Sequence, residues 1–590
     1  MKEVKEYIKR FDNHQDYISF INSNDYAKPN VSSCSAESHV HYDYDYAYVP
    51  LTVVPLEDIT IKFTNKVYFS SKYSSGNTYY SVDGARTWTE FTSADTISVE
   101  ANKPIQFKGN LKNTTYMIGS FIIPGKFNLK GNPLSMTNMD NFGEVVSPTQ
   151  AIAYLFSGTG VVSAEEVKTN VGAKNGYVSI PTDMFSNLFV SCYNLVKAVN
   201  LRNLTRKISG MGCCSSIFAR CSGLTEVPDI IYDDTTIGGE ASLAAAFAYC
   251  TSLRKMPRIK TKEVTSRVVF NLTFAFCDSL TELPPVLEVE KFSGTESCAE
   301  MFMDCTALET VPKGFLPLTE LPTSTYYSMF RGCTSLKNVP DLPSPKVEFY
   351  GYAYMFSGCT SLETVPRDLL TVTSVGSEGC EHMFDSCTSL RNAPELPATS
   401  VASRGYVAMF ANCTSLKEAP SVLQAMKITQ YAYASMFSGC TSLETAPEID
   451  GVSGSSYCME NMFDGCTSLV TGPSAIHVQT LYSNGRASGM CKSMFAGCSS
   501  LETAPVIETE NLTYNNRPVE EMFMNMFNGC SSLGEIKVGF KSTVDTATNQ
   551  LTDWVKGVAD NGTFYMPADS AWEVTRGDSG VPTNWNLVTE

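Results

Sequence analysis

The sequence predicts a repeat solenoid, with a strand and a short helical turn in each coil, behind an N-terminal all-β sandwich. Three observations predict this fold class: a cysteine that recurs at a nearly constant interval, an apolar motif around it, and an earlier segment of alternating apolar and polar residues. At 590 residues the chain is too long for one hydrophobic core, so an array or several domains are expected.

The repeat is defined by thirteen cysteines that share one frame at separations of 26 to 32 residues, a period typical of solenoids. Around each of them the pattern is Met-Phe-x-Gly-Cys-Thr-Ser-Leu-x-x-Ala/Val-Pro. A degenerate earlier copy places Thr159 in the cysteine position, as expected of a capping repeat, so about 13 to 14 coils are predicted. The cysteines are Cys192, Cys221, Cys250, Cys277, Cys305, Cys333, Cys359, Cys387, Cys413, Cys440, Cys466, Cys498 and Cys530.

Each coil is predicted to be of the leucine-rich-repeat type. Phe, Cys and Leu follow one another at three-residue steps, which places them on one face of a short helical turn. An extended stretch such as Leu362–Pro366 follows, in which Leu362 and Val365 turn inward and the proline closes the strand. No single coil can bury its own Met, Phe, Cys and Leu, so neighbouring coils must stack.

The cysteines are predicted to be small buried hydrophobic residues. One cysteine per coil provides neither a CxxC pair nor a histidine partner, which argues against redox activity and metal binding. Cys298, Cys380 and Cys491, three residues before the Met, are interpreted in the same way. For the adjacent Cys213 and Cys214 a disulfide or a metal role stays open as an alternative.

Four regions are predicted: a docking module at 1–47, an immunoglobulin-like sandwich at 48–145, the solenoid at 146–540 and a C-terminal cap at 541–590. The docking module should hold a short strand at 3–11 and a helix at 13–23. Within the sandwich, the segment around Asp83-Gly84 comes close to the Asp-box of propeller hairpins, but a propeller would need several copies of that motif. Asp83-Gly84 therefore predicts a tight hairpin turn. The cap should contain a helix at 550–556, stopped by Gly557, and a hairpin over 562–585.

The formal net charge of −17 opposes attraction to phosphate backbones and to anionic lipid. We therefore expect neither nucleic acid nor a membrane as a partner, and no transmembrane run is present. The first twenty residues lack the apolar stretch of a secretory signal peptide. We expect the protein to be made in a cytoplasm and to leave it by lysis or as part of a particle.

No enzyme motif is apparent, and we expect no catalytic residue, cofactor or metal. The five histidines lie outside any metalloprotease, nucleophile or phosphate-binding pattern; they are His14, His39, His41, His382 and His477. Two alternatives stay open. The alternating His39, His41 and Asp43 could hold a metal instead of forming an aromatic edge strand, and carboxylates such as Glu226 and Glu282 could serve a glycosidase.

Two sets of residues are candidates for ligand binding. The first is a ladder of polar residues two places after each leucine, namely Thr310, Asn338, Thr364, Asn392, Thr445 and Thr503. The second lies in the two longest loops between motifs, where insertions often carry binding, and comprises Tyr482, Arg486, Tyr514 and Arg517. Ordinary outward strand positions and ordinary loop residues are the alternatives.

The repeat motif resembles the BspA-like leucine-rich repeats of surface proteins in gut Bacteroidetes and other microbes, over residues from about 150 to 540. Near the N-terminus, Lys28–Ser32 and the following Val40–Tyr42 look like the start of structural proteins from phages of gut Bacteroidetes, crAss-like phages among them. The resemblance implies adhesion when a bacterium carries such a protein, and host attachment when a virion does.

The resemblance and the missing leader together lead us to expect a non-catalytic virion surface protein of the tail-fibre or head-fibre type. Its N-terminal module would dock on other virion proteins, and its solenoid would meet a host surface polysaccharide or outer-membrane protein. A homo-oligomer such as a trimer would fit a fibre. The alternatives are a structural virion decoration that binds no receptor, and an adhesin on a bacterial cell surface.

Overall fold

The computed structural model describes residues 49–67, 77–109, 117–137, 152–169, 182–205, 207–232, 235–425, 427–449, 452–480, 488–509, 512–514 and 517–590. These residues belong to two compact units, which are described separately: unit 1 runs to residue 284 and includes 288–294, and unit 2 contains 285–287 and 295–590. The expected docking module, including His39, His41 and Asp43, lies outside the described residues.

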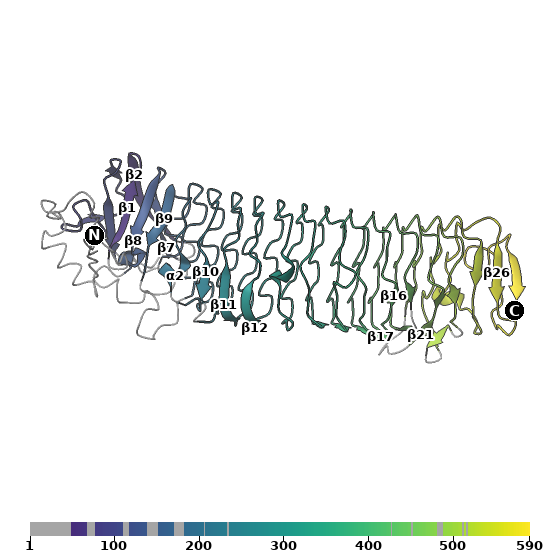
Figure 1. Cartoon of the computed structure of the whole chain (residues 1–590). Helices are drawn as coiled ribbons and strands as arrows, with labels where there is room; N and C mark the ends of the chain where they lie inside the picture. The colour runs from purple at the N-terminus through teal and green to yellow at the C-terminus, as the bar shows by residue number, and fades with distance from the viewer. Residues whose placement is uncertain are drawn as a thin grey trace, which may run out of the picture. The chain divides into compact units, whose positions relative to one another are not determined.

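Unit 1 begins with two β-sheets that face each other, one with the order β4-β3-β6-β1-β8-β9 and the other β5-β2-β7 (Figure 1). Phe63 and Phe121 of the second sheet meet Phe91 and Phe107 of the first, with ring centroids 6.4 and 4.9 Å apart. All four rings are buried, so facing phenylalanines form the core of the predicted sandwich. The strands are β1 (Leu51–Pro55), β2 (Ile59–Val67), β3 (Thr78–Ser81), β4 (Thr89–Phe91), β5 (Ile97–Val99), β6 (Ile105–Gly109), β7 (Met117–Ile122), β8 (Phe127–Gly131) and β9 (Val161–Val167).

The β3–β4 hairpin turns at Asp83 as predicted, but through the longer loop 82–88. The Asp83 carboxylate accepts hydrogen bonds from the main chain of Arg86 and Thr87 and from the Thr87 hydroxyl at 2.6 Å. The bond from that hydroxyl is the main reason why the pKa of Asp83 is lowered. A tight two-residue turn was therefore the wrong prediction, because the Asp83 side chain organises a wider loop.

The Met-Phe segment of each repeat is a ladder of turns, and the predicted helical turn is wrong. The Phe356 N–H donates to Met383 O of the next repeat at 2.9 Å, whereas the following Ser357 N–H donates to Tyr354 O of its own repeat at 3.1 Å. An α-helix would send every N–H to its own segment. Every fourth residue is instead left-handed, as at Tyr354 (φ 57°) and Gly358 (φ 75°). Among the described residues the one α-helix is the four-residue α2 (Leu201–Leu204).

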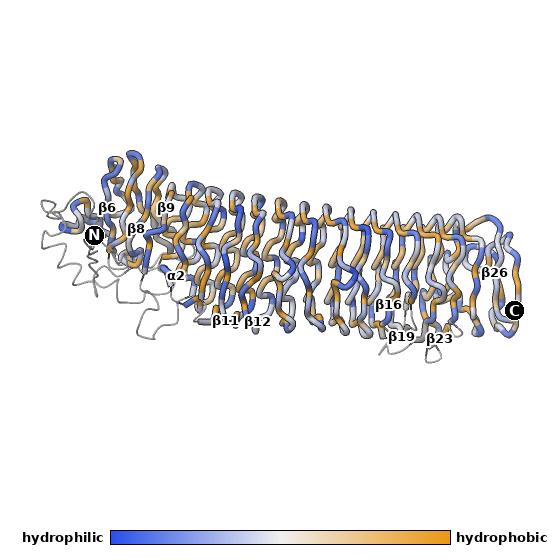
Figure 2. The backbone as a smooth tube through the Cα atoms, in the orientation of Figure 1, coloured by the Kyte–Doolittle hydropathy of each residue, from blue (hydrophilic) through white to orange (hydrophobic). Residues whose placement is uncertain are grey.

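Apolar side chains of this segment stack in columns from one repeat to the next, and Figure 2 shows apolar positions recurring along successive turns of unit 2. From Phe302 to Phe527, nine rings lie 5.3 to 5.8 Å apart and within 15° of parallel. In unit 1 a similar column runs from Phe121 of β7 to Phe274. The sandwich and the first repeats therefore share one core.

The repeat cysteines line the same core, as predicted. In the described residues every cysteine is buried and free, and Cys213 and Cys214 have their Sγ atoms 3.9 Å apart. Twelve of the thirteen repeat cysteines also donate a hydrogen bond to the phenylalanine carbonyl of the preceding repeat, as Cys387 does to Phe356 O at 3.1 Å. Thr159 takes this position in the first repeat, where its hydroxyl donates to its own Phe156 O at 2.8 Å.

In most repeats the regular strands follow the proline instead of preceding it, which corrects the predicted position. Leu362 and Val365 do turn inward, but the stretch that holds them makes at most isolated bridges with its neighbours. Parallel strands come later in the coil, where proline no longer removes a donor. They are β10 (Ile230–Tyr232), β11 (Ile259–Val264) and β12 (Glu288–Phe292) in unit 1, and β13 (Lys346–Val347), β14 (Ser374–Val375), β15 (Ser400–Val401), β16 (Val422–Leu423), β17 (Lys427–Ile428), β18 (Glu448–Ile449), β19 (Val452–Gly454), β20 (Ala475–Ile476), β21 (Val478–Thr480) and β22 (Val506–Ile507) in unit 2.

The end of unit 2 continues the stacking, so the predicted helix at 550–556 and the predicted hairpin are both wrong. Phe527 N donates to Trp554 O at 2.7 Å, and Gly557 (φ 76°) lies over Gly529, as glycines of successive repeats do. The strands β25 (Glu535–Lys537), β26 (Thr563–Met566) and β27 (Asn586–Thr589) pair in parallel. Buried Trp554 and Trp585 close the core in place of the repeat's smaller side chains.

Candidate functional site

The ladder of polar residues after each leucine divides into two kinds of side chain. Thr310, Thr364, Thr445 and Thr503 are exposed. The Asn338 amide instead bonds both main-chain groups of Val311 in the preceding repeat, at 3.0 and 2.8 Å. Asn392 does the same to Val365 at 3.3 and 2.7 Å. The two asparagine amides therefore hold adjacent repeats together, and ligand binding by the ladder stays a prediction.

The second predicted set, from the two longest loops, is only partly described by the structure. Tyr482 and Arg486 fall outside the described residues. Tyr514 and Arg517 belong to β23 (Thr513–Tyr514) and β24 (Arg517–Pro518), where they are paired across a short antiparallel ladder. Only their main chains are described, so this set stays a prediction.

A third region, which the sequence reasoning missed, lies on the turn face of unit 2. It combines aromatic rings with a buried carboxylate, and we call it the aromatic–carboxylate cluster. Its members come from the Met-Phe turns of four successive repeats: Tyr327, Phe349, Tyr350, Tyr354, Glu381, His382 and Arg404.

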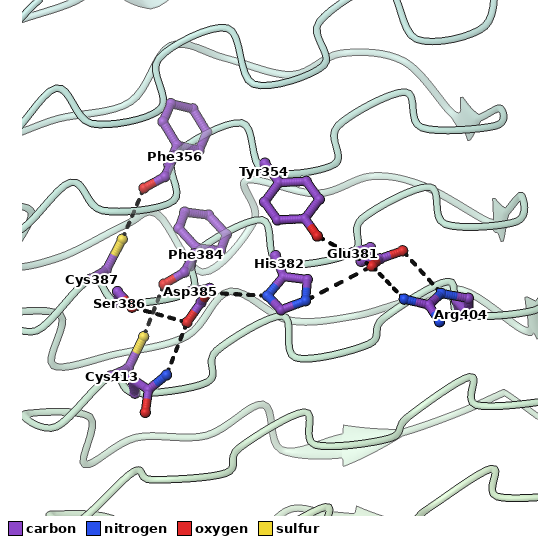
Figure 3. Close-up of polar contacts among 11 residues, drawn as sticks. Tyr354, Phe356, Glu381, His382, Phe384, Asp385, Ser386, Cys387, Arg404 and Cys413 are labelled. Atoms are coloured by element: carbon purple, nitrogen blue, oxygen red, sulfur yellow. Dashed lines mark hydrogen bonds and ion pairs between the residues drawn. The ribbon is translucent and has the colours of Figure 1, made fainter. Parts of the chain in front are cut away.

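Glu381 organises the cluster (Figure 3). Its side chain is only 3% exposed, and its oxygens accept from Arg404 Nη2 at 2.8 Å and Nε at 3.3 Å. The Tyr354 hydroxyl lies 3.4 Å from the same carboxylate. A carboxylate at this depth needs such partners, and the forked contact fixes the Arg404 guanidinium in one orientation.

His382 connects this carboxylate to a second one. Its ring stacks on Tyr354 at 4.7 Å, and its Nδ1 lies 3.1 Å from Asp385 Oδ2. The Asn412 amide donates to the other Asp385 oxygen at 3.2 Å. Burial alone would raise the pKa of Asp385, but the hydrogen bonds with His382 and Asn412 outweigh it, and the pKa is lowered.

The aromatic part of the cluster is open to solvent on one side. Phe349 is 44% exposed and packs edge-on against Tyr350 at 4.3 Å. Tyr327 packs edge-on against both Tyr350 and Tyr354, at 5.7 and 5.9 Å. These contacts hold the four rings in a fixed arrangement, which reduces the entropy lost when a ligand binds.

The two tyrosine hydroxyls remain protonated well above neutral pH. A hydrogen bond with Glu378 raises the pKa of Tyr350 to about 12. Burial, together with the Glu381 charge, raises the pKa of Tyr354 to about 12. The cluster therefore places partly exposed rings beside tyrosine hydroxyls and the Arg404 guanidinium, which buried Glu381 holds in place, an arrangement that suits a ligand with an apolar face and hydroxyl edges.

Unit 1 carries two adjoining hollows of about 450 and 430 Å³ that share Glu165, Val196 and Lys197. Glu226, one of the carboxylates considered for a glycosidase, lines the second hollow. Glu165 is ion-paired with Lys197 at 3.0 Å. Across the described residues no group of three His, Cys, Asp or Glu side chains is placed to hold a metal ion, and no helix is long and apolar enough to cross a bilayer.

A signal for the turn face was present in the sequence. Tyr350, Glu378, Arg404, Tyr431 and Tyr457 each stand nine residues before a repeat cysteine. Five successive repeats therefore place an aromatic or charged residue at a position that the motif itself leaves open. The predicted motif left this position open, so the sequence analysis did not consider the column that stacking makes of these residues.

The geometry defines a repeat protein whose turns stack in parallel and whose surface carries a preformed polar and aromatic cluster. Residues 182–392 and 323–470 match the model of the BspA type leucine-rich repeat region, in six copies that together cover just under half of the chain. The matched model describes a repeat region and not an enzyme domain. No curated protein matches the chain.

Proposed function

We propose that the protein is a non-catalytic binding protein that attaches to a cell-surface glycan through the aromatic–carboxylate cluster. The observation that carries the proposal is the exposed Phe349 ring, with the half-buried Tyr350 and Tyr354 next to it, beside the fixed Glu381–Arg404 pair. A sugar ring has an apolar face of C–H groups, which can pack on an aromatic ring, and an edge of hydroxyls, which can bond to the half-exposed Arg404 guanidinium.

The resemblance of the sequence to phage structural proteins gives this proposal its setting. The protein would stand on the virion surface, docked through residues 1–47, with an immunoglobulin-like sandwich and a solenoid that reaches a host polysaccharide or outer-membrane protein. A homo-oligomer such as a trimer would multiply the contacts. Attachment of a bacterial adhesin would use the same cluster.

The test is binding of the purified full-length protein to a panel of gut Bacteroidetes strains with and without their capsules. Strain-selective, capsule-dependent binding is expected. The variant Phe349→Ala should bind about tenfold more weakly, which corresponds to ~1.4 kcal/mol for one aromatic contact. Tyr193→Ala is the matched control, because Tyr193 is an aromatic residue with 59% exposure in unit 1.

Two outcomes would contradict the proposal. Binding that Phe349→Ala leaves unchanged would move the site away from the cluster. Failure of the protein to bind any strain would favour a structural virion decoration.

A further inference from the structure

A second aromatic pair lies on the turn face of unit 2, in line with the cluster. Tyr431 and Tyr457 stack at 5.1 Å with 7° between their rings. Lys492 lies 5.9 Å over the Tyr457 ring and 2.7 Å from Glu521. Like the cluster, this pair therefore combines partly exposed rings with a cation that is fixed by a carboxylate.

One column of residues joins the aromatic–carboxylate cluster to the Tyr431–Tyr457 pair. Tyr350, Glu378, Arg404, Tyr431 and Tyr457 are all left-handed, with φ between 52° and 58°. The N–H of each donates to a carbonyl of the next repeat at 2.9 to 3.3 Å, so the five residues occupy the same place in successive repeats. At roughly 4.8 Å for each stacked strand, the column from Tyr350 to Tyr457 spans ~19 Å.

We propose that this column binds a single neutral polysaccharide chain that runs along the stacking direction and rests on aromatic rings at both ends. The inference rests on the proposed function and names its ligand class. A monosaccharide could contact one end alone, whereas a chain of several sugars reaches both ends, and the second contact then forms at a high effective concentration.

The charges along the column favour a neutral chain. The cations Arg404 and Lys492 are each paired with a carboxylate, Glu381 and Glu521. The column itself contains the Glu378 carboxylate, and Glu460 lies near both Tyr431 and Lys492. An anionic polysaccharide would meet this negative surface on a chain whose net charge is −17.

The test uses the full-length protein on an array of purified neutral and anionic capsular polysaccharides, followed by titration with size-fractionated hydrolysis fragments of the polysaccharide that binds. Wild type should retain a neutral polysaccharide and bind it about 100-fold more tightly than fragments of two sugars. Tyr457→Ala should weaken polymer binding about tenfold and leave the affinity for the shortest fragments unchanged. Tyr457→Phe keeps the ring and should bind like wild type, and Tyr193→Ala is the control.

Each contrary result has its own meaning. Equal affinity for short fragments and polymer, or no effect of Tyr457→Ala, would overturn the proposal that a chain binds along the column. Either result would leave the proposed binding at the aromatic–carboxylate cluster intact. Retention of anionic polysaccharides alone would overturn the neutral class, and with it this inference, but not the proposed function. If the protein binds no polysaccharide on the array, both this inference and the proposed function are overturned.

Discussion

Alkaline pH should unfold unit 2, because its core contains a large set of protonated thiols. Thirteen of its cysteines are completely buried, and burial raises the pKa of the thiol in twelve of them. For Cys458, Cys466 and Cys530 the pKa rises to about 12. The others are Cys298, Cys333, Cys359, Cys380, Cys387, Cys413, Cys440, Cys491 and Cys498.

The sign and size of the effect follow from the two states of the chain. A thiol of the unfolded chain ionises near pH ~8.5, whereas its folded counterpart stays protonated to much higher pH. The stability that the thiols contribute is therefore complete below pH ~8.5 and is lost as the pH rises above it. At pH ~9.5 each thiol favours unfolding by about 1.4 kcal/mol. Twelve thiols together approach ~17 kcal/mol, which exceeds the ~5–15 kcal/mol stability of a typical domain.

The measurement is urea unfolding, followed by circular dichroism in the presence of a reductant, at pH values from 7 to 10. Stability should be nearly constant from pH 7 to 8 and should fall steeply above that range. The double variant Cys413→Ala, Cys440→Ala should fall less steeply, by about two protons in the slope. A stability that stays level through pH 9.5 would refute the reasoning, since buried thiols cannot ionise in the folded unit.

Three further predictions concern packing and hydrogen bonds in unit 2. Phe410→Ala should cost ~3–5 kcal/mol, because this ring is fully buried inside the column, and an unchanged urea midpoint would contradict the role of the column. Asn338→Ala should cost ~1–3 kcal/mol by leaving a main-chain pair unbonded, whereas exposed Thr364→Ala should stay within ~0.5 kcal/mol; equal thermal shifts would contradict that distinction. Asp385, which is hydrogen-bonded to His382, has a lowered pKa, so its ionised form stabilises the fold above the usual carboxyl pKa, and this stability is lost as the pH falls through the lowered pKa. In urea titrations the wild type should therefore be more stable than Asp385→Asn at pH 6, and the difference should shrink below pH ~4. An undiminished difference at pH 3 would count against this role of Asp385.

The core of the repeats could be predicted because it depends on composition and period alone. A cysteine, a phenylalanine and a leucine at fixed places must pack against their copies, whatever the backbone between them does. The turn conformation could not be predicted in this way. A three-residue spacing fits a helical turn, but only the alternation of hydrogen bonds between repeats, as at Phe356 and Ser357, produces the ladder of left-handed residues.

The candidate site depended on that missing conformation. The strand-face prediction treated Asn338 and Thr364 as equivalent outward residues, yet an asparagine amide can bond both main-chain groups of a neighbouring repeat and a threonine cannot. Tyr354 and His382 come from different repeats and meet only because the turns stack in register. Their separation of 28 residues equals that of Cys359 and Cys387, so the repeat period places them in neighbouring turns, but it does not predict that their rings stack.

The most direct test of the central claim is hydroxyl-radical footprinting of the full-length protein with and without a capsular polysaccharide from a strain that it binds. We predict that Phe349, Tyr350 and Tyr354 become protected, while the exposed strand-face Thr364 and the distant Tyr193 react as before. Protection of the strand face with no change at the three rings would contradict the account.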